Sequence, residues 1–208
     1  VPASLAIASR EGDVAPGAGG ALFGAGQNLV GLGDGGHVSA RNSLTGAGVL
    51  SSGGTANSVG LWSGTPGKLG MMARENSAAQ GLGGALYAVG GFTSAGLATN
   101  ASGQNAFFAN LRTAVAGVTA ANARTLWTGT PGSLTLVARE GSAAPGTAGA
   151  SFNVLPSTVA INGSGHVAFT GSLTGGDSVT GVNNAGLWVG PAGGLSLVTR
   201  MGDAAPGT

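Results

Sequence analysis

The feature that most constrains the fold of this chain is an internal repeat of about 64 residues. The sequence Leu-Val-Ala-Arg-Glu-Gly-Ser-Ala-Ala-Pro-Gly-Thr occupies residues 136–147, and related segments occupy 7–17, 71–81 and 197–208. Each Trp of the chain follows a Leu, an Asn stands five residues before it, and an aromatic residue follows three of the motif arginines by thirteen positions. Self-similarity at a fixed period predicts a protein built from repeated supersecondary units.

The repeated positions fall into four sets. They are Arg10, Arg74, Arg139 and Arg200; Trp62, Trp127 and Trp188; Asn57, Asn122 and Asn183; and the aromatics Phe23, Tyr87 and Phe152. Counted from residue 5, the repeats span 5–69, 70–134 and 135–195, with a partial fourth at 196–208, all within one repeat domain.

Apolar and polar residues alternate with a period of two inside each repeat, which predicts β-strands. In the third repeat we expect strands at 158–161, 166–173, 186–189 and 195–200, joined by Gly-rich turns. The second turn of the earlier repeats carries Pro66-Gly67 and Pro131-Gly132, which suits a type II turn. The chain is therefore predicted to be all-β. Each repeat should form a four-stranded antiparallel sheet, near Leu29–Arg74, Leu97–Arg139 and Thr158–Arg200.

Four strands in two hairpins per repeat are typical of a β-propeller blade. A solenoid coil would be shorter, and a sandwich would not need the same Arg and Trp in every repeat. The alternative architecture is an elongated array of small stacked sheets. The fourth-strand motif occurs both at Leu5–Arg10 and at Leu195–Arg200, so 13 strands are expected, one of them spare. Three blades fall short of the usual four to eight, so a longer chain or further copies should complete the ring or sheet.

Two repeats carry a recognisable signature at the first turn. Asn100-x-x-Gly103-x-x-Ala106-Phe107 and Asn162-x-x-Gly165-x-x-Ala168-Phe169 match the pattern of the bacterial tandem-repeat proteins called NxxGxxAF. The first repeat keeps only Gly36 of that pattern. The Ala-Arg-Glu-Gly and Leu-Trp-x-Gly stretches are also similar, so the resemblance covers essentially the whole chain. It implies secretion or surface display and a propeller-like fold, and it supplies no catalytic motif.

Composition excludes several classes of function. Charged residues make up 7% of the chain and the net charge is +1, which rules out nucleic-acid binding by a basic stripe. Cysteine is absent, which rules out disulfides, Cys-ligated zinc and thiol nucleophiles. No apolar run reaches the 18 residues of a membrane helix, so no membrane insertion is expected. Abundant Gly, Ala, Ser, Thr and Asn, and a start at Val1-Pro2-Ala3-Ser4, favour an extracellular or cell-surface location.

Most charged residues lie in the repeated motif. One interpretation is that they are cation ligands or form a sugar-binding rim. These residues are Arg10, Glu11, Asp13, Arg74, Glu75, Arg139, Glu140, Arg200 and Asp203. Their repetition favours a structural role, because an active site is seldom built identically in every repeat. Neither Asp13 nor Asp203 lies in an Asp-x-Asp-x-Asp loop of the kind that binds calcium. We expect no metal and no cofactor.

The remaining candidates for chemistry also have simpler structural explanations. His37 and His166 follow the turn glycine and are expected to face solvent. The sequence contains neither a Gly-x-Ser-x-Gly elbow before a helix nor a phosphate loop, so no catalytic residue is assigned. The three Trp rings are expected in the core beside the repeated aromatics, the alternative being stacking on sugars. Asn100 and Asn162 begin N-glycosylation sequons in turns that are expected to be exposed.

The leading hypothesis is a non-enzymatic extracellular structural or interaction protein that pairs with itself. A spare strand exposes backbone groups that pair with another chain, head to tail, giving a closed ring or, as we favour, a surface filament. The alternative is a lectin-like propeller module that binds surface polysaccharide. A third hypothesis is a hydrolase whose catalytic residues lie outside these 208 residues. Solvent exposure of the three Trp rings would separate the first two.

Overall fold

The computed structural model describes the backbone of residues 5–205, and the side chains there except at positions 29–30 and 93–95. The Val1-Pro2-Ala3-Ser4 start and the last three residues of the fourth motif lie outside this range. Within it, strands are joined by turns and loops, and a three-residue 3₁₀ turn at Ala120–Asn122 is the single helical element. The all-β prediction is confirmed.

The strands form three antiparallel sheets, one for each repeat. The first contains β1 (Leu22–Leu32), β2 (Val38–Thr45), β3 (Val59–Thr65) and β4 (Lys68–Arg74), in that order. The second contains β5 (Tyr87–Thr99), β6 (Asn105–Leu111), β7 (Arg124–Thr130) and β8 (Ser133–Arg139). The third contains β10 (Val159–Ile161), β11 (Val167–Thr174), β12 (Ala185–Gly190) and β13 (Ser196–Arg200), and β9 (Ser151–Val154) also pairs with β11. The sheets end at the repeated arginines, whereas the sequence periods 5–69 and 70–134 end inside β4 and β8.

The first strands of the first and second sheets begin earlier than the sequence predicts. β1 starts at Leu22 rather than Leu29, and β5 starts at Tyr87 rather than Leu97. Both strands contain register shifts, the first of them between Phe23 and Gln27 in β1. A β-bulge adds an unpaired residue and breaks the two-residue alternation, which hides the strand from a pattern search.

The turns adopt the conformations that their glycines predict. Gly36, Gly103 and Gly165 have φ of +76°, +81° and +80°, at the left-handed position of the first hairpin in each sheet. Gly67 and Gly132 follow proline with φ of +77° and +80°, as in a type II turn. The two hairpins of each repeat are therefore fixed locally by turn chemistry.

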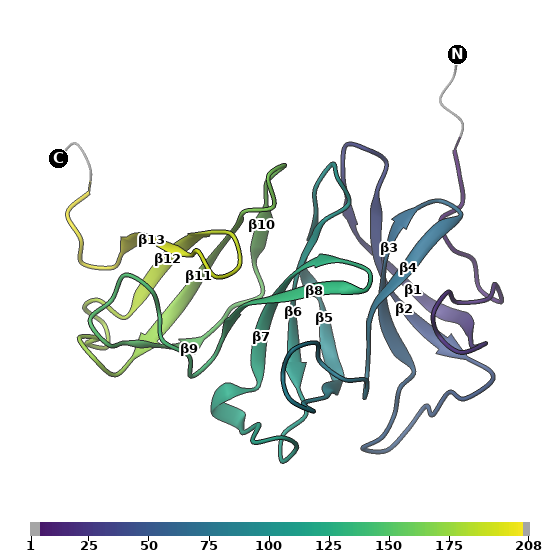
Figure 1. The fold of residues 1–208 in the computed structure, drawn as a ribbon, viewed down its shortest axis with the longest axis horizontal. Coiled ribbons are helices and arrows are strands. Elements are labelled where there is room, and N and C mark those ends of the chain that lie inside the picture. Colours follow the sequence, from purple (N-terminus) through teal and green to yellow (C-terminus); the bar gives the residue numbers. More distant parts are fainter. Residues whose placement is uncertain (1–4, 206–208) are drawn as a thin grey trace.

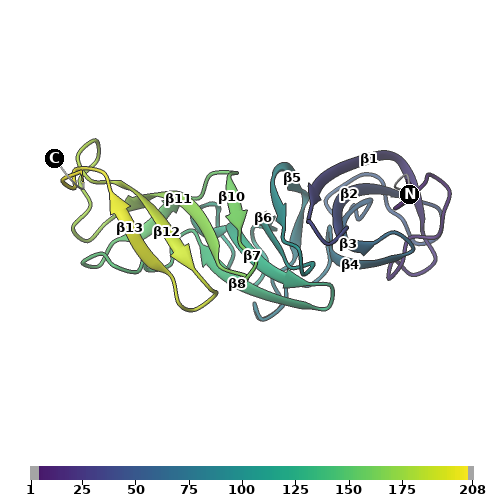
Figure 2. The same cartoon turned by 90° about the horizontal axis from the view of Figure 1, so that it is seen from above.

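The three sheets lie in a row, with the two ends of the chain at opposite ends of the molecule (Figure 1). Figure 2 shows the first strands β1, β5 and β10 along one side of this row, with β4 and β8 along the other. β5 contacts both β1 and β10. The sheets do not close into a ring or a barrel within residues 5–205.

The expectation that Leu5–Arg10 forms a spare strand is wrong. In the structure this segment has no regular secondary structure. The count of 13 strands arises differently, because β9 and β10 divide what is one long strand in the other two sheets. A strand is stable only when its backbone groups are paired, and none of the strands described within residues 5–205 pairs with residues 5–10.

Neighbouring sheets pack face to face. We call the face of each sheet that carries its Trp the front face, and the opposite face, which carries the Leu before the Trp, the back face. The first core combines the back face of the first sheet with the front face of the second, including Leu61, Ala73, Phe107 and Trp127. The second core repeats this arrangement one sheet further on, with Phe108, Leu126, Phe169 and Trp188. β6 is therefore buried on both faces.

Candidate functional site

The repeated arginine at the end of each sheet binds the loop between the second and third strands. In every sheet its Nε donates to the backbone carbonyl of the repeated Asn. The pairs are Arg74 with Asn57 at 2.7 Å, Arg139 with Asn122 at 2.6 Å, and Arg200 with Asn183 at 2.6 Å. The constant Asn–Trp–Arg spacing in the sequence therefore corresponds to one repeated contact.

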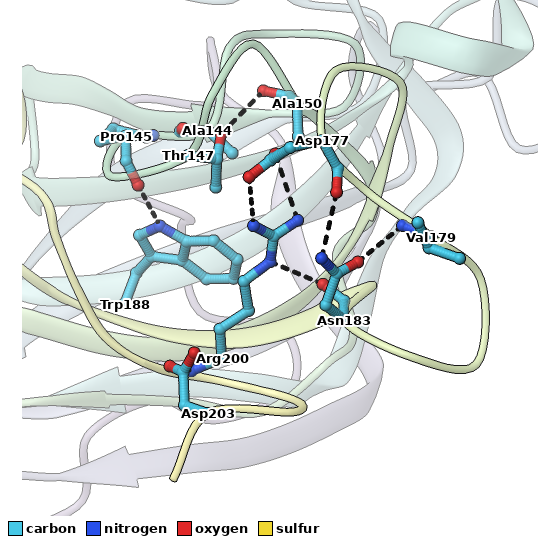
Figure 3. Close-up of polar contacts among 10 residues, drawn as sticks. All are labelled: Ala144, Pro145, Thr147, Ala150, Asp177, Val179, Asn183, Trp188, Arg200 and Asp203. Atoms are coloured by element: carbon cyan, nitrogen blue, oxygen red, sulfur yellow. Dashed lines mark hydrogen bonds and ion pairs between the residues drawn. The ribbon is translucent and has the colours of Figure 1, made fainter.

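The Asn side chain in turn closes its own loop. In the third repeat Asn183 Oδ1 accepts from the backbone N–H of Val179 at 2.6 Å, and its Nδ2 donates to the carbonyl of Asp177 at 3.0 Å (Figure 3). Asn57 and Asn122 make the same two kinds of bond in their loops. The sequence shows the position of these residues but not this role.

The first and last arginines show what the loop of the preceding sheet contributes to this contact. Arg200 also forms an ion pair with Asp177, with 2.6 Å between Nη1 and Oδ2, and its hydrogen bond lowers the pKa of that carboxyl (Figure 3). Arg10 pairs with Asp13 at 3.0 Å, and its side chain is 71% exposed. No sheet precedes Arg10 in the part of the chain that the structure describes, and there Arg10 binds no loop carbonyl of the kind that the other three arginines bind.

This difference gives a matched pair of variants. Arg139→Ala removes a charged hydrogen bond and should lower the free energy of unfolding by about 1.5–3 kcal/mol. Arg10→Ala removes an exposed ion pair and should change it by less than about 0.5 kcal/mol. Urea denaturation followed by circular dichroism measures both. Equal losses in the two variants would contradict the structural role given to the Arg–Asn contact.

The three Trp rings occupy equivalent buried positions, each 0% exposed. Each packs edge-on against the repeated aromatic of its own sheet. The pairs are Trp62 with Phe23, Trp127 with Tyr87, and Trp188 with Phe152, at centroid distances of 5.1, 5.8 and 4.9 Å. Burial raises the pKa of Tyr87. The rings lie in the core, where no sugar can stack on them.

In the first and third repeats the Trp indole also anchors the loop that precedes the sheet. Trp62 and Trp188 donate Nε1–H to the carbonyls of Pro16 and Pro145, both at 2.9 Å (Figure 3 for Trp188). Gln80 replaces this proline in the second repeat, and Trp127 instead donates to Thr125 Oγ1 at 2.8 Å. The Pro-Gly of the repeated motif is thus part of the packing of the sheet that follows it.

Two carboxylates of the motif are buried, which the sequence does not indicate. Glu75 is 3% exposed and Glu140 is 8% exposed. Glu75 accepts backbone N–H groups from Val59 at 3.1 Å and from Gly90 of the second sheet at 2.6 Å. Glu140 accepts from Leu155 at 3.1 Å. Carboxylates that bind otherwise unpaired backbone donors stabilise the junction between sheets.

Arginines of the back faces also bridge the sheets. Arg41 Nε donates to the carbonyl of Phe92 at 3.0 Å. Arg124 donates to the carbonyl of Leu155 and lies over the Phe108 ring, 5.1 Å from its centroid. Desolvation by burial lowers the pKa of Arg124, and the nearby charge of Glu140 opposes that shift. Both arginines thus serve the packing between sheets.

The two histidines differ in their surroundings. His166 is exposed, as expected for a turn residue. The expectation that His37 faces solvent is wrong, because its ring lies against the turn of the second repeat. A Cβ on Gly103 would be 2.5 Å from His37 Cδ2, and the Nδ1 of His37 is buried without a partner. The absence of a side chain at Gly103 makes this close approach possible.

The expectation that both sequon turns are exposed holds only for Asn162. Asn100 is 5% exposed, and its Nδ2 donates to Gln104 Oε1 at 2.9 Å and to the carbonyl of Asn162 at 2.8 Å. The amide nitrogen to which a glycan would be attached is therefore hydrogen-bonded at the contact between two repeats. The prediction for Asn100 is corrected accordingly.

The rest of the surface offers few groups that could bind a ligand. No group of three or more His, Asp or Glu side chains gathers in the part of the chain that the structure describes. A groove between the second and third sheets is lined mainly by hydroxyls and amides, namely Gln104, Thr128, Thr130, Ser133, Thr135 and Ser164. No helix among the described residues is long and apolar enough to cross a membrane.

The whole described structure falls within one family match. A family model described as "Family of unknown function (DUF7453)" matches residues 2–208. No curated protein and no solved structure matches the chain.

Proposed function

The chain belongs to the family of unknown function DUF7453, and we propose that it is a non-enzymatic extracellular structural protein that assembles head to tail with further copies of itself. The observation that carries this proposal is the set of contacts that the repeated residues make in the structure. Every repeated Arg–Asn contact of the three sheets and every Trp ring serves packing within a sheet or loop. The side chains that recur most regularly are thus used to build a scaffold.

The arrangement of the sheets supports a propeller-type organisation. The first strands β1, β5 and β10 lie next to one another, and the fourth strands β4 and β8 lie on the opposite side of the row (Figure 2). In a propeller the first strands of successive blades surround the axis. The resemblance to the secreted NxxGxxAF repeat proteins and the low charge of the chain favour an extracellular or cell-surface location.

A surface left uncovered by the chain supports self-association. The back faces of the first and second sheets are buried by the sheet that follows, while β11 alternates between buried and partly or fully exposed residues. Since each internal junction uses the same pair of faces, a further copy is the partner that fits the third. A head-to-tail contact of this kind closes as a ring or continues as a filament.

Carbohydrate binding is the alternative, and it loses its main support in this structure. A lectin site at the junctions would need exposed aromatic rings, and the three Trp rings are fully buried. We therefore place polysaccharide second to another copy of the chain as a partner.

The proposal predicts self-association at low protein concentration. Light scattering coupled to size-exclusion chromatography, from about 1 to 100 µM, should show a mass that rises with concentration, as linked association equilibria require. The physical reason is the uncovered back face of the third sheet. A single mass equal to one chain across this range would contradict the proposed function.

A further inference from the structure

Residues 5–10 repeat the sequence of a fourth strand. Counted back from the repeated arginine, Ile7 aligns with Leu197 of β13, and Ser9 aligns with Thr199. Leu5 likewise aligns with Leu195. The segment therefore carries apolar residues at the positions where Leu195, just before β13, and Leu197, within it, pack against the second core.

The chain already holds this segment where a fourth strand would enter. The turn that follows Arg10 is the same as in the other repeats, since Asp13 N–H donates to the Arg10 carbonyl at 3.1 Å, as Ser77 N–H does to that of Arg74. Gly12 N–H then donates to the carbonyl of Phe23 at 2.9 Å. The loop between residues 10 and 23 thus has the geometry that joins two sheets elsewhere.

The contacts of Ser9 show how residues 5–10 lie against the first sheet. Its hydroxyl is hydrogen-bonded to the side-chain amide of Gln27 at 2.8 Å, and Asn42 Nδ2 approaches it to 3.5 Å. Gln27 is paired with Asn42 across β1 and β2. At the next junction the aligned residues are Ala73, Phe92 and Ala109, which lie together in one core. Residues 5–10 therefore lie on the first sheet as β4 lies on the second.

Among residues 5–205, no strand pairs with this segment. Leu5 is 103% exposed and Ile7 is 71% exposed. The aligned Leu69 and Met71 are partly buried against the core of their own sheet. No sheet of the described residues covers Leu5 and Ile7 in this way, and both side chains are exposed in the structure.

The third sheet exposes the back face that is covered in the other two sheets. On its back face Leu187 is only partly buried and Thr170 is exposed, whereas the aligned Leu126 and Phe108 are 0% and 1% exposed. Two shallow apolar grooves cross this face beside Thr170 and Ala185. β13 covers none of it, because it extends the sheet at its edge.

We propose that residues 5–10 of a second copy replace β13 in the third sheet, which places the first sheet of that copy on the exposed back face. This inference rests on the proposed function and names the segment and the acceptor that join the copies. The first sheet of the second copy can pack on this back face, as successive sheets of one chain pack on each other, only if the exchange takes place. The reason is that the loop after Arg10 directs residues 5–10 of the second copy into the position that β13 occupies. Leu5 and Ile7 replace Leu195 and Leu197 in the core, so the exchange itself is nearly balanced. The burial of the back face supplies the net gain.

The register of the proposed strand can be tested by cross-linking. Leu187 pairs with Thr199, so the exchanged strand places Ser9 of one copy opposite Leu187 of the other. The chain has no Cys, so the full-length Ser9→Cys/Leu187→Cys variant carries the only two thiols. Under mild oxidation it should give a ladder of disulfide-linked oligomers on a non-reducing gel. Ser9→Cys/Thr170→Cys is the matched control, because Thr170 lies on the same face one strand further away and out of disulfide reach.

A second variant tests the burial of the segment without cross-linking. Ile7→Lys should leave the fold of the separate chain unchanged, since Ile7 is 71% exposed, and should weaken self-association at least about tenfold by placing a charge in the second core. Leu50→Lys, at another exposed apolar position (53%), should not weaken it. If the wild type associates but shows neither the Ser9–Leu187 cross-link nor the Ile7→Lys effect, the strand exchange is wrong and the proposed function stands. A wild type that remains monomeric overturns both.

Discussion

Replacing Trp127 by Ala should lower the free energy of unfolding by about 3–5 kcal/mol, as for other large aromatic residues removed from a core. The ring is 0% exposed and packs on Tyr87 in a core shared by the first and second sheets. Its loss opens a cavity at the centre of the molecule. It also leaves Thr125 Oγ1 without the indole donor that lies 2.8 Å away. Urea denaturation followed by circular dichroism gives the change directly.

Trp127→Phe is the control for this measurement. It keeps an aromatic ring beside Tyr87 and should cost clearly less than Trp127→Ala. A loss below about 1 kcal/mol for Trp127→Ala would contradict the core position and return the Trp rings to consideration as a sugar-binding surface.

Phe108→Ala should destabilise the chain to a similar extent, by about 3–5 kcal/mol. Phe108 is on the back face of the second sheet, 1% exposed, within the core that joins it to the third sheet. Arg124 lies over its ring. Because two sheets share this core, the unfolding transition should remain single but move to lower urea concentration.

Thr170 is the equivalent position on the third sheet, and it is exposed. Thr170→Ala should therefore change the free energy of unfolding of the separate chain by less than about 0.5 kcal/mol. Comparable losses at Phe108 and Thr170 would contradict the face-to-face packing of the sheets, because that packing predicts burial at the first position alone.

The hairpins could be predicted from the sequence because local rules determine them. Asn or Gly three residues before a left-handed Gly sets the first turn, and Pro-Gly sets the second, at positions such as Gly103 and Gly132. The beginnings of β1 and β5 could not be predicted, because their bulges break the alternation of apolar residues. The strand expected at Leu5–Arg10 failed for a different reason. Its sequence is that of a strand, but strand formation depends on a partner that the pattern does not reveal.

The packing between sheets left weaker signals in the sequence. Phe107 and Phe108 are adjacent, so a strand that contains both must bury an aromatic on each face, as buried strands between two layers do. That pair could have predicted the junction of the second and third sheets. The burial of Glu75 and Glu140 could not, because their donors include backbone N–H groups 15 residues further along the chain, at Gly90 and Leu155.

Electron cryo-microscopy of the wild-type protein, at a concentration where light scattering shows association, tests the central claim most directly. The account predicts chains of evenly stacked sheets in which the third sheet of one copy is followed by the first sheet of the next, in a ring or a filament. Discrete three-sheet particles, or copies joined through other surfaces with the back face around Leu187 still exposed, would contradict it.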